Sequence, residues 1–197
     1  MNKPLIIGFD GIDGTGKTSL IEKLKSDSAF KEKVIATRCR EPPSPYIEDM
    51  YIQMQKYKES FEAVELFAKD LEFRYSKMPE NKMILSDRTF FSALTFYNAI
   101  SELSGMRDEQ LCDKLIQGLQ KYHPTLSIIL LADVNTTRKR MIKRKKALQV
   151  TDEIGFQKAC AKNFADINLL KNPFIINTKK LTKERVYNCV KEKLSIL

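Results

Sequence analysis

The sequence has a single histidine, His123, and four cysteines that stand far apart, at positions 39, 112, 160 and 189. No two cysteines form a Cys-x-x-Cys pair and no histidine cluster accompanies them, so the closely spaced soft ligands of a structural zinc site are missing. We expect reduced, mostly buried thiols. His123 precedes Pro124 at the start of an apolar segment, and we interpret it as a turn residue and not as a catalyst.

Long apolar runs are also absent, and no segment approaches the length needed to span a bilayer. The apolar residues 4–9 are too few for the core of a signal peptide, and no small-residue cleavage site follows them. We therefore expect an intracellular, cytoplasmic protein that is not attached to a membrane. The 197 residues suit one domain, 1–197, that carries a small lid.

Positive charge is in excess, with a formal net charge of +9. Such a surplus fits nucleic acid, an anionic membrane surface, or small polyanions such as nucleotides. It is concentrated at residues 138–146, where seven of nine side chains are basic. This run can form a solvated face, a nucleic-acid patch or a lid over phosphates, and the other motifs must decide between these uses.

Short apolar segments alternate with amphipathic helical segments along the chain. We expect strands at residues 4–9, 34–37, 83–85, 127–131 and 174–176. We expect helices at residues 18–25, 46–78 with a break near 58–60, 91–103, 108–122, 136–146, 155–170 and 183–197. Strands that alternate with helices imply right-handed crossovers and a parallel sheet covered on both faces, which is an α/β fold of three layers.

A glycine-rich segment follows the first expected strand. Residues 11–18 read Gly-Ile-Asp-Gly-Thr-Gly-Lys-Thr and fit the P-loop pattern G-x-x-x-x-G-K-[ST], with a strand before it and a helix after it. Its backbone N–H groups can surround phosphate oxygens, and the helix N-terminus adds its dipole. Lys17 is predicted to bridge the β- and γ-phosphates of a nucleoside triphosphate, and Thr18 to hold Mg²⁺. The predicted donor site comprises Gly11, Gly14, Thr15, Gly16, Lys17, Thr18 and Ser19.

The loop alone does not separate GTPases, motor ATPases and small-molecule kinases. A switch-type GTPase needs Asp-x-x-Gly and Asn-Lys-x-Asp, but Asp87 is followed by Arg-Thr-Phe, and Asn81-Lys82 by Met-Ile-Leu. A remodelling ATPase needs a longer domain. A kinase needs arginines around the acceptor phosphate, and Arg88 follows a strand at the edge where ligands bind in open α/β sheets.

With these features the chain resembles the thymidylate kinase family, over nearly its whole length. Four blocks carry the resemblance: residues 11–18, Arg40-Glu41-Pro42, Asp87-Arg88 with Ser92, and residues 138–146 followed by Gly155-Phe156-Gln157. It implies a three-layer P-loop NTPase fold with a central parallel sheet and a short basic lid at about 138–152.

The resemblance also implies roles for individual residues. Asp13 lies near the acceptor's sugar and phosphate, Arg88 contacts that phosphate and Arg40 supports it. Glu41 either lies near the acceptor sugar or fixes the proline turn. The loop carries no basic residue between Ile12 and Thr15, so a lid arginine is expected to be catalytic. Arg144 is the first candidate, with Arg138 and Arg140 behind it. The predicted catalytic residues are Lys17, Asp13, Arg88, Arg144 and Arg138.

The base-binding positions depart from the family. Phe67 matches the phenylalanine that lies under the thymine ring in the family. Four residues later the family has an arginine, but this chain has Leu71. Arg74 lies one helical turn away and can replace it only if the helix is shifted. At a position where the family often has a polar residue that reads the base edge, this chain has Ala93. Such losses weaken discrimination, because a site rejects wrong substrates through its buried polar groups.

Two tyrosines of the family are also replaced, by Thr89 and Phe96. Thymidylate is the leading acceptor in spite of these changes. The predicted acceptor site comprises Asp13, Arg40, Glu41, Phe67, Arg74, Asp87, Arg88, Ser92 and Phe96.

The function implied is ATP- and Mg²⁺-dependent phosphorylation of a nucleoside monophosphate, dTMP to dTDP first, by a homodimer. One alternative is a deoxynucleoside kinase or another nucleoside monophosphate kinase. Arg88 and Arg40 favour a monophosphate, because an acceptor without phosphate leaves them less to bind. A non-catalytic nucleotide-binding protein whose basic face contacts nucleic acid is the least favoured alternative, and it predicts salt-sensitive binding to polynucleotides.

Overall fold

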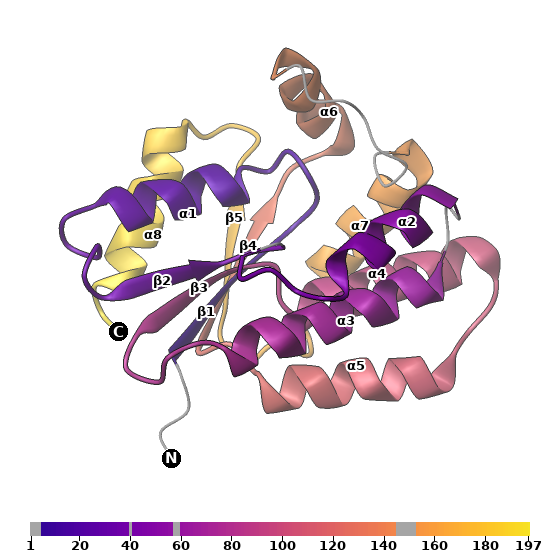
Figure 1. Ribbon diagram of the computed structural model, residues 1–197. Helices are drawn as coiled ribbons and strands as arrows, with labels where there is room; N and C mark the ends of the chain where they lie inside the picture. Colours follow the sequence, from indigo (N-terminus) through magenta and orange to yellow (C-terminus); the bar gives the residue numbers. More distant parts are fainter. Residues whose placement is uncertain (1–4, 40, 57–59, 145–152) are drawn as a thin grey trace.

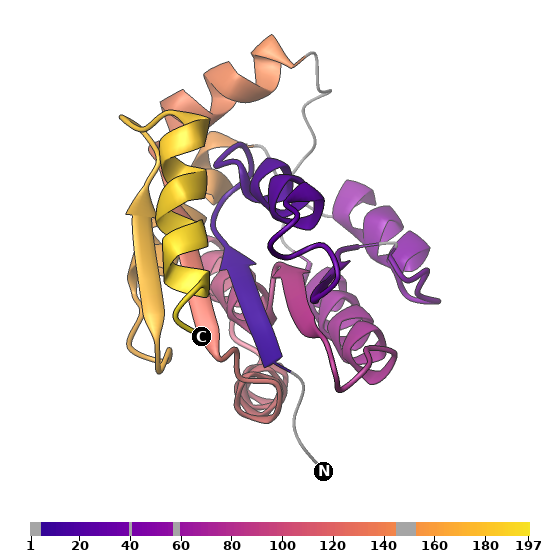
Figure 2. The same ribbon diagram turned by 90° about the vertical axis from the view of Figure 1, so that its left-hand side faces the viewer.

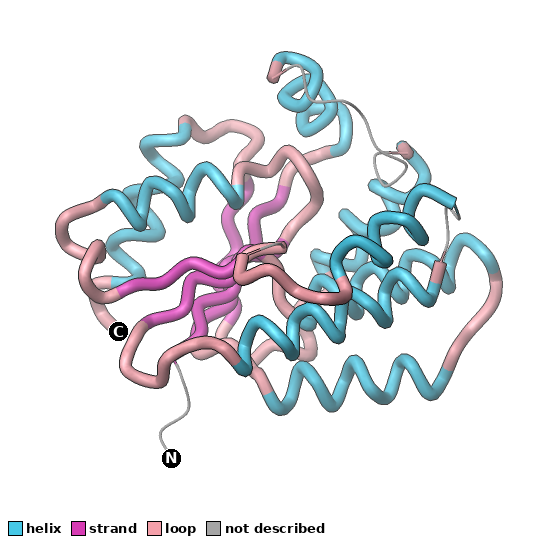
Figure 3. The backbone as a smooth tube through the Cα atoms, viewed as in Figure 1, coloured by secondary structure: helices cyan, strands magenta, loops and turns pink. Residues whose placement is uncertain are grey.

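The computed structural model describes residues 5–39, 41–56, 60–144 and 153–197. Its centre is a parallel sheet of five strands in the order β2-β3-β1-β4-β5 (Figures 1 and 3). This arrangement confirms the predicted α/β class. The strands are β1 (Leu5–Asp10), β2 (Val34–Thr37), β3 (Met83–Asp87), β4 (Leu126–Leu131) and β5 (Pro173–Asn177).

Helices cover both faces of the sheet and produce the three expected layers. One face is covered by α1 (Lys17–Ser26) and α8 (Lys183–Leu194). The other is covered by α3 (Phe61–Ser76), α4 (Phe90–Ser104), α5 (Glu109–Lys121) and α7 (Ile154–Ala165), with α2 (Ile47–Lys56) packed on α3. Figure 2 shows α6 (Val134–Lys143) beyond the carboxyl ends of the strands.

The strand β1 is apolar on both sides because both of its faces are buried. Ile7 and Phe9 belong to the core under α1 and α8, whereas Ile6 belongs to the core on the other face. Successive side chains of a strand point to opposite faces, so a strand covered on both faces reads as a continuous apolar run. Ile6 pairs with Ile84 of β3, and Phe9 with Ile128 of β4.

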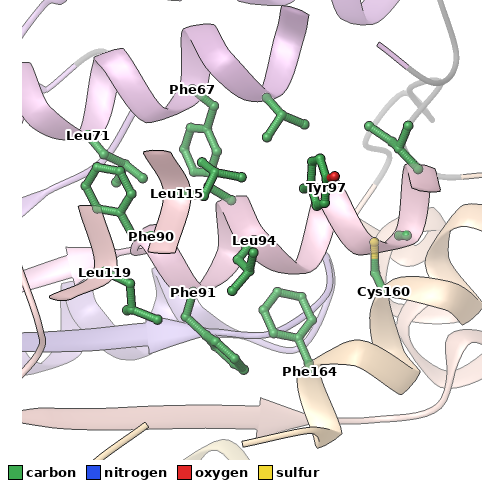
Figure 4. Close-up of a cluster of buried hydrophobic side chains, with 14 of the residues drawn as sticks. Phe67, Leu71, Phe90, Phe91, Leu94, Tyr97, Leu115, Leu119, Cys160 and Phe164 are labelled. Carbon is green, nitrogen blue, oxygen red and sulfur yellow. The ribbon is translucent and has the colours of Figure 1, made fainter. Parts of the chain in front are cut away.

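Helix α4 occupies the middle of the larger core, where Phe91, Leu94 and Tyr97 lie among residues of the neighbouring helices (Figure 4). Helix α5 approaches it closely at Gly118. A Cβ added at Gly118 would lie 2.3 Å from Cε1 of Phe90. Glycine is therefore required at this position by the packing of the two helices.

Capping residues stand at the ends of the expected helices. Ser60 caps α3 by accepting the N–H of Ala63 at 3.2 Å, which agrees with the predicted break before it. Asp108 caps α5 by accepting the N–H of Leu111 at 3.0 Å. Gly105 ends α4 in the left-handed conformation, with φ of 71°. Side chains that satisfy the first N–H groups of a helix define where it begins.

Two helices are shorter than the pattern indicated. The segment expected to be helical through residue 170 ends at Ala165. There the Asp166 carboxylate accepts the backbone N–H of Asn168 at 3.4 Å, and this local bond competes with helical backbone. The last helix ends at Leu194 and not at residue 197. Residues 145 and 146, expected to continue the basic helix, lie outside the described ranges.

His123 lies at the amino end of the sheet, opposite the edge at which β1 and β3 end. Its Nδ1 lies 2.8 Å from the carbonyl oxygen of Pro124, and its Nε2 accepts the N–H of Lys171 at 3.3 Å. These bonds suit the predicted turn residue. None of the described helices is long and apolar enough to cross a membrane.

Candidate active site

The loop between β1 and α1 depends on three glycines in the left-handed region. Gly11, Gly14 and Gly16 have φ of 137°, 82° and 106°. A Cβ at Gly11 would lie 2.3 Å from the Leu130 carbonyl oxygen, and one at Gly14 would lie 2.8 Å from that of Thr137. Gly16, just before α1, lines both cavities over the loop, and apart from its own chain neighbours no residue lies within 4 Å of its Cβ position. The helix N-terminus is therefore open to an approaching anion, as a phosphate site requires.

Lys17 is folded back over this loop. Its Nζ donates to the carbonyl oxygens of Gly11 at 2.8 Å and Ile12 at 3.0 Å. Burial, and after it the positive charge of Arg88, lower the pKa of Lys17 to about 8. Thr15 closes the loop from the other side, with its Oγ1 donating to the carbonyl of Ile12 at 2.9 Å. A bound phosphate would compete with these carbonyls for the ammonium group.

Thr18 and Asp87 lie together at the carboxyl edge of the sheet. The Thr18 hydroxyl donates to Asp87 Oδ2 at 2.7 Å. A hydroxyl and a carboxylate are oxygen ligands of the kind that Mg²⁺ prefers, and a P-loop threonine with an aspartate at a strand end holds it in related sites. These residues fit a magnesium ion. Asp87 was predicted only as part of the acceptor site, so its closeness to Thr18 adds a possibility that the sequence did not reveal.

Arg88 reaches across to the loop from the start of α4. Its Nη2 donates to Asp13 Oδ1 at 2.8 Å, and its Nη1 donates to the Gly11 carbonyl at 3.1 Å. Both side chains are largely buried, with 14% and 28% of their surfaces exposed for Arg88 and Asp13. The structure thus brings together two predicted residues that are 75 positions apart.

Aromatic rings adjoin Arg88 on the side away from the loop. Its guanidinium lies over the ring of Phe96, 4.9 Å from the centroid. The centroid of Phe96 is 5.9 Å from that of Phe67, which comes from α3. Ser92 is fully buried, and its hydroxyl donates to Asp10. The same Ser92 oxygen lies 3.5 Å from Arg88 Nη1. Phe96 and Ser92 therefore contact Arg88 directly, whereas Phe67 is buried in the core behind Phe96.

The positions that depart from the family lie inside the core. Leu71 and Ala93 are fully buried and offer no polar atom to a ligand. Arg74 is also fully enclosed, with Nε donating to Asp70 at 2.8 Å and Nη1 to the Thr37 hydroxyl at 3.4 Å. Arg74 would touch a substrate only if neighbouring residues moved.

The segment after β2 contributes a residue that sequence reasoning missed. Arg38 lines the same cavity as Asp87 and Arg88. It also binds Glu41, with Nη2 at 2.6 Å from Oε1 and two backbone hydrogen bonds between the residues. Of the two proposals for Glu41, this arrangement suits the one in which it fixes the turn. The available signal for Arg38 was a basic residue directly after a strand. Arg40 lies outside the described residues.

Two cavities meet over the loop. One has a volume of about 220 Å³ and is lined by Asp13, Lys17, Thr18, Asp87, Arg88 and Arg144 among others. The other has a volume of about 430 Å³ and includes Lys23, Arg140, Thr178, Lys183 and Tyr187. Gly14, Gly16, Ser19 and Arg144 line both. Two ligands could thus occupy adjoining spaces on either side of residues 14–16.

The lid arginines differ in where they lie. Arg144, the first candidate for the catalytic arginine, lies at the end of α6 and lines both cavities. Arg140 is held by Thr178, donating to its Oγ1 at 3.0 Å and its carbonyl at 2.6 Å. Arg138 lines neither of the two cavities. The remainder of the predicted lid, residues 145–152, lies outside the described ranges.

Comparison with known proteins agrees with this geometry. The family model for thymidylate kinase matches residues 9–189. The chain is 32% identical over 136 residues to probable thymidylate kinase 1 of Saccharolobus solfataricus. The matched segment covers 66% of this chain and 65% of that protein's own length. It is 26% identical over 188 residues to the probable thymidylate kinase of Sulfurisphaera tokodaii, covering 92% and 91% of the two chains.

Solved structures share the fold. A deoxyadenosine kinase from M. mycoides, with the products dCMP and a flexible dCDP bound, superposes with a TM-score of 0.74 at 16% identity, over 98% of this chain and all of that one. The thymidylate kinase of Candida albicans superposes with a TM-score of 0.73 at 18% identity, over 98% and 92%.

Proposed function

Because the chain belongs to the thymidylate kinase family, we propose that it transfers the γ-phosphoryl group of ATP to a nucleoside monophosphate, converting dTMP to dTDP. The observation that carries this proposal is the position of Arg88. It is a buried cation that faces the P-loop from the far side, 2.8 Å from Asp13. A second phosphate group, on the acceptor, is the ligand that best fits such a cation.

On the donor side, Lys17 and the amides of the loop hold the phosphates of ATP. Thr18 and Asp87 would hold Mg²⁺, which would offset the charge of the donor phosphates. The ammonium of Lys17 leaves its present carbonyl partners, Gly11 and Ile12, for a phosphate oxygen. A phosphate oxygen is negatively charged whereas a carbonyl oxygen is neutral, so Coulomb attraction to the ammonium favours this exchange.

On the acceptor side, Arg88 and Asp13 orient the monophosphate, and Arg38 adds positive charge to the same cavity. The family resemblance gives Arg40, outside the described residues, a supporting role. A phosphate oxygen of the acceptor forms a bond to the γ-phosphorus. The bond from that phosphorus to the β–γ bridging oxygen breaks, and ADP leaves with the electron pair. We assign Arg144 to the charge that develops on the moving group, because it lines both cavities and keeps its proton.

The base of the acceptor is proposed to lie against Phe67 and Phe96, beside Arg88. Leu71 and Ala93 are buried in the core and supply no hydrogen bond to a base edge. We therefore expect dTMP to be preferred by shape more than by polar contacts, with weaker rejection of other pyrimidine monophosphates.

A deoxynucleoside is the second candidate acceptor, because the fold is shared with a deoxyadenosine kinase. The deciding experiment is a coupled assay of ADP release, with ATP and Mg²⁺, against a panel of nucleosides and nucleoside monophosphates. Turnover confined to monophosphates supports the proposal. Turnover on nucleosides alone moves the substrate, and ATP binding without any turnover contradicts the reaction.

We also propose that the protein acts in the cytoplasm as a homodimer, as the family resemblance implies. Light scattering on the purified chain at micromolar concentration tests the assembly. A mass of about 23 kDa, that of the 22.8 kDa chain, would contradict a dimer. Fractionation of expressing cells tests the location.

A further inference from the structure

The backbone at Arg88 is unusual. Among the non-glycine residues that the structure describes, Arg88 alone has a positive φ, at 76°. An L-residue with a side chain rarely adopts this conformation, and it persists only when its surroundings hold it there. Such outliers gather at functional sites, so the groups that hold Arg88 are of interest.

The first support comes from the strand side, through Ser86 and Tyr75. The Ser86 hydroxyl donates to the carbonyl oxygen of Arg88 at 2.7 Å. The Tyr75 hydroxyl lies 2.9 Å from the same Ser86 oxygen. Because the single proton of Ser86 is used on Arg88, Tyr75 is the donor in this pair. Burial raises the pKa of Tyr75 to about 12, so it keeps the proton that it donates.

The second support comes from the helix side, through Asp10. This fully buried carboxylate at the end of β1 accepts the N–H of Thr89 at 3.0 Å, the Thr89 hydroxyl at 2.8 Å and the hydroxyl of Ser92. Glycine at position 8 makes room for this contact, since a Cβ there would lie 2.6 Å from Cγ2 of Thr89. The residue after Arg88 is thereby tied to the strand that leads into the P-loop.

Arg88 is thus held on both sides. Its own N–H donates to the Phe9 carbonyl at 3.0 Å, its carbonyl is fixed by Ser86, and the next peptide is fixed by Asp10. With the backbone turned in this way, the guanidinium reaches Asp13 and the Gly11 carbonyl. An extended conformation at residue 88 would direct the side chain elsewhere.

We propose that Tyr75 and Asp10 are positioning residues, which hold Arg88 in its left-handed conformation and so aim its guanidinium at the acceptor phosphate. This inference rests on the proposed function, because it assumes that Arg88 binds the acceptor. Neither residue lines the two cavities over the P-loop. Their positioning effect passes through Arg88 and therefore concerns the acceptor first.

Tyr75→Phe and Asp10→Asn test this. Each removes or weakens one support, and loss of a hydrogen bond of this kind is expected to weaken dTMP binding and raise its KM by about 3- to 10-fold. Calorimetry should give an ATP affinity for Tyr75→Phe that matches the wild type. Tyr97→Phe is the matched control. It removes a buried tyrosine hydroxyl that accepts the N–H of Asp108 at 3.1 Å, far along α4, and should leave dTMP binding unchanged.

A double-mutant cycle with Arg88→Ala separates positioning from general stability. If Tyr75 and Asp10 act through Arg88, their substitution should not weaken dTMP binding further once the guanidinium is gone. Equal losses in the wild-type and Arg88→Ala backgrounds would overturn the proposal.

A spectroscopic readout needs no turnover. The Nε–H signal of Arg88 in ¹⁵N NMR, identified by its absence in Arg88→Ala, should shift in Tyr75→Phe and Asp10→Asn and stay in place in Tyr97→Phe. An unmoved signal in both test variants would also overturn the proposal. Wild-type protein that turns over no acceptor would contradict the proposed function, whereas active wild type with unaffected variants would contradict the positioning alone.

Discussion

The Thr18 hydroxyl donates a hydrogen bond of 2.7 Å to Asp87 Oδ2, although 69 positions separate the two residues. Parallel pairing of β1 with β3 places Asp87 opposite Phe9, close to where β1 turns into the P-loop. The carboxylate therefore faces the first turn of α1 without any local sequence signal.

Substitution of Asp87 by Asn should weaken the response to magnesium. The neutral amide keeps the size of the side chain but loses the charge, and changes of this kind around a metal cost about 10- to 100-fold in metal affinity or activity. Activity titrated with Mg²⁺ at constant ATP measures this. Asp108→Asn, at the N-cap of α5, is a control that should not move the midpoint. An unchanged midpoint in Asp87→Asn would place the metal elsewhere.

Lys17→Ala and Arg88→Ala should both lower kcat by at least about 100-fold, because each removes a preorganised charge. They should differ in binding. Lys17→Ala should lose most triphosphate affinity, whereas Arg88→Ala should keep it and lose dTMP affinity. Calorimetry with ATP and with dTMP separates the two sides. Full activity in either variant would refute the role assigned to it.

Donor binding should weaken as the pH rises above about 8. Burial lowers the pKa of Lys17 to about 8 in the ligand-free protein, so the ammonium loses its proton above that pH. Phosphates favour the protonated form, and ATP binding should therefore take up a proton. Calorimetry in buffers of different ionisation enthalpy measures this uptake. Lys17→Arg is the control, since arginine stays charged, and its ATP affinity should be level over the same range.

Lys17 should also affect the stability of the fold, and this effect should increase with pH whereas donor binding weakens. Lys17 in the unfolded chain keeps its proton up to its ordinary pKa of 10.5, whereas the folded protein releases it near 8. Between these values the unfolded state binds more protons, so this residue's contribution to the free energy of unfolding rises with pH. Urea denaturation of wild type and Lys17→Arg at several pH values tests it. A difference between the two that does not change with pH would contradict the lowered pKa.

Two glycine-to-alanine substitutions in helices should act in opposite directions. Gly118→Ala should destabilise by about 1–3 kcal/mol, because the new methyl group would collide with Phe90. Gly155→Ala in α7 meets no atom within 4 Å and should stabilise by up to about 1 kcal/mol, as alanine does in helices. Urea denaturation of both variants measures the changes. Stabilisation by Gly118→Ala would show that α4 and α5 can separate at no cost.

Much of the fold was predictable because its signals are local. The strand at residues 34–37 matched β2 in full, and the caps at Ser60 and Asp108 depend only on side chains within three residues. The end of α7 was missed because the Asp166 carboxylate accepts the backbone N–H of Asn168, a local bond that the spacing of apolar residues does not indicate.

The candidate site divides along the same line. The P-loop is specified by contiguous residues, because its glycines set the backbone turn and Lys17 donates to carbonyl oxygens of the same loop. Arg38 was missed, and Asp87 was expected only on the acceptor side, because their surroundings depend on strand pairing. Arg74 was expected near the base, but it lies fully buried against Asp70.

The sequence alone determined the fold class, the phosphate loop and the kind of chemistry, since each follows from residue types at fixed short spacings. Only the tertiary structure decided which distant groups share a space: Thr18 with Asp87, Arg88 with Asp13, and Arg88 with the Tyr75 and Asp10 networks. Those contacts form between segments whose relative positions are set by the register of the sheet and the packing of its helices. No single segment carries that information.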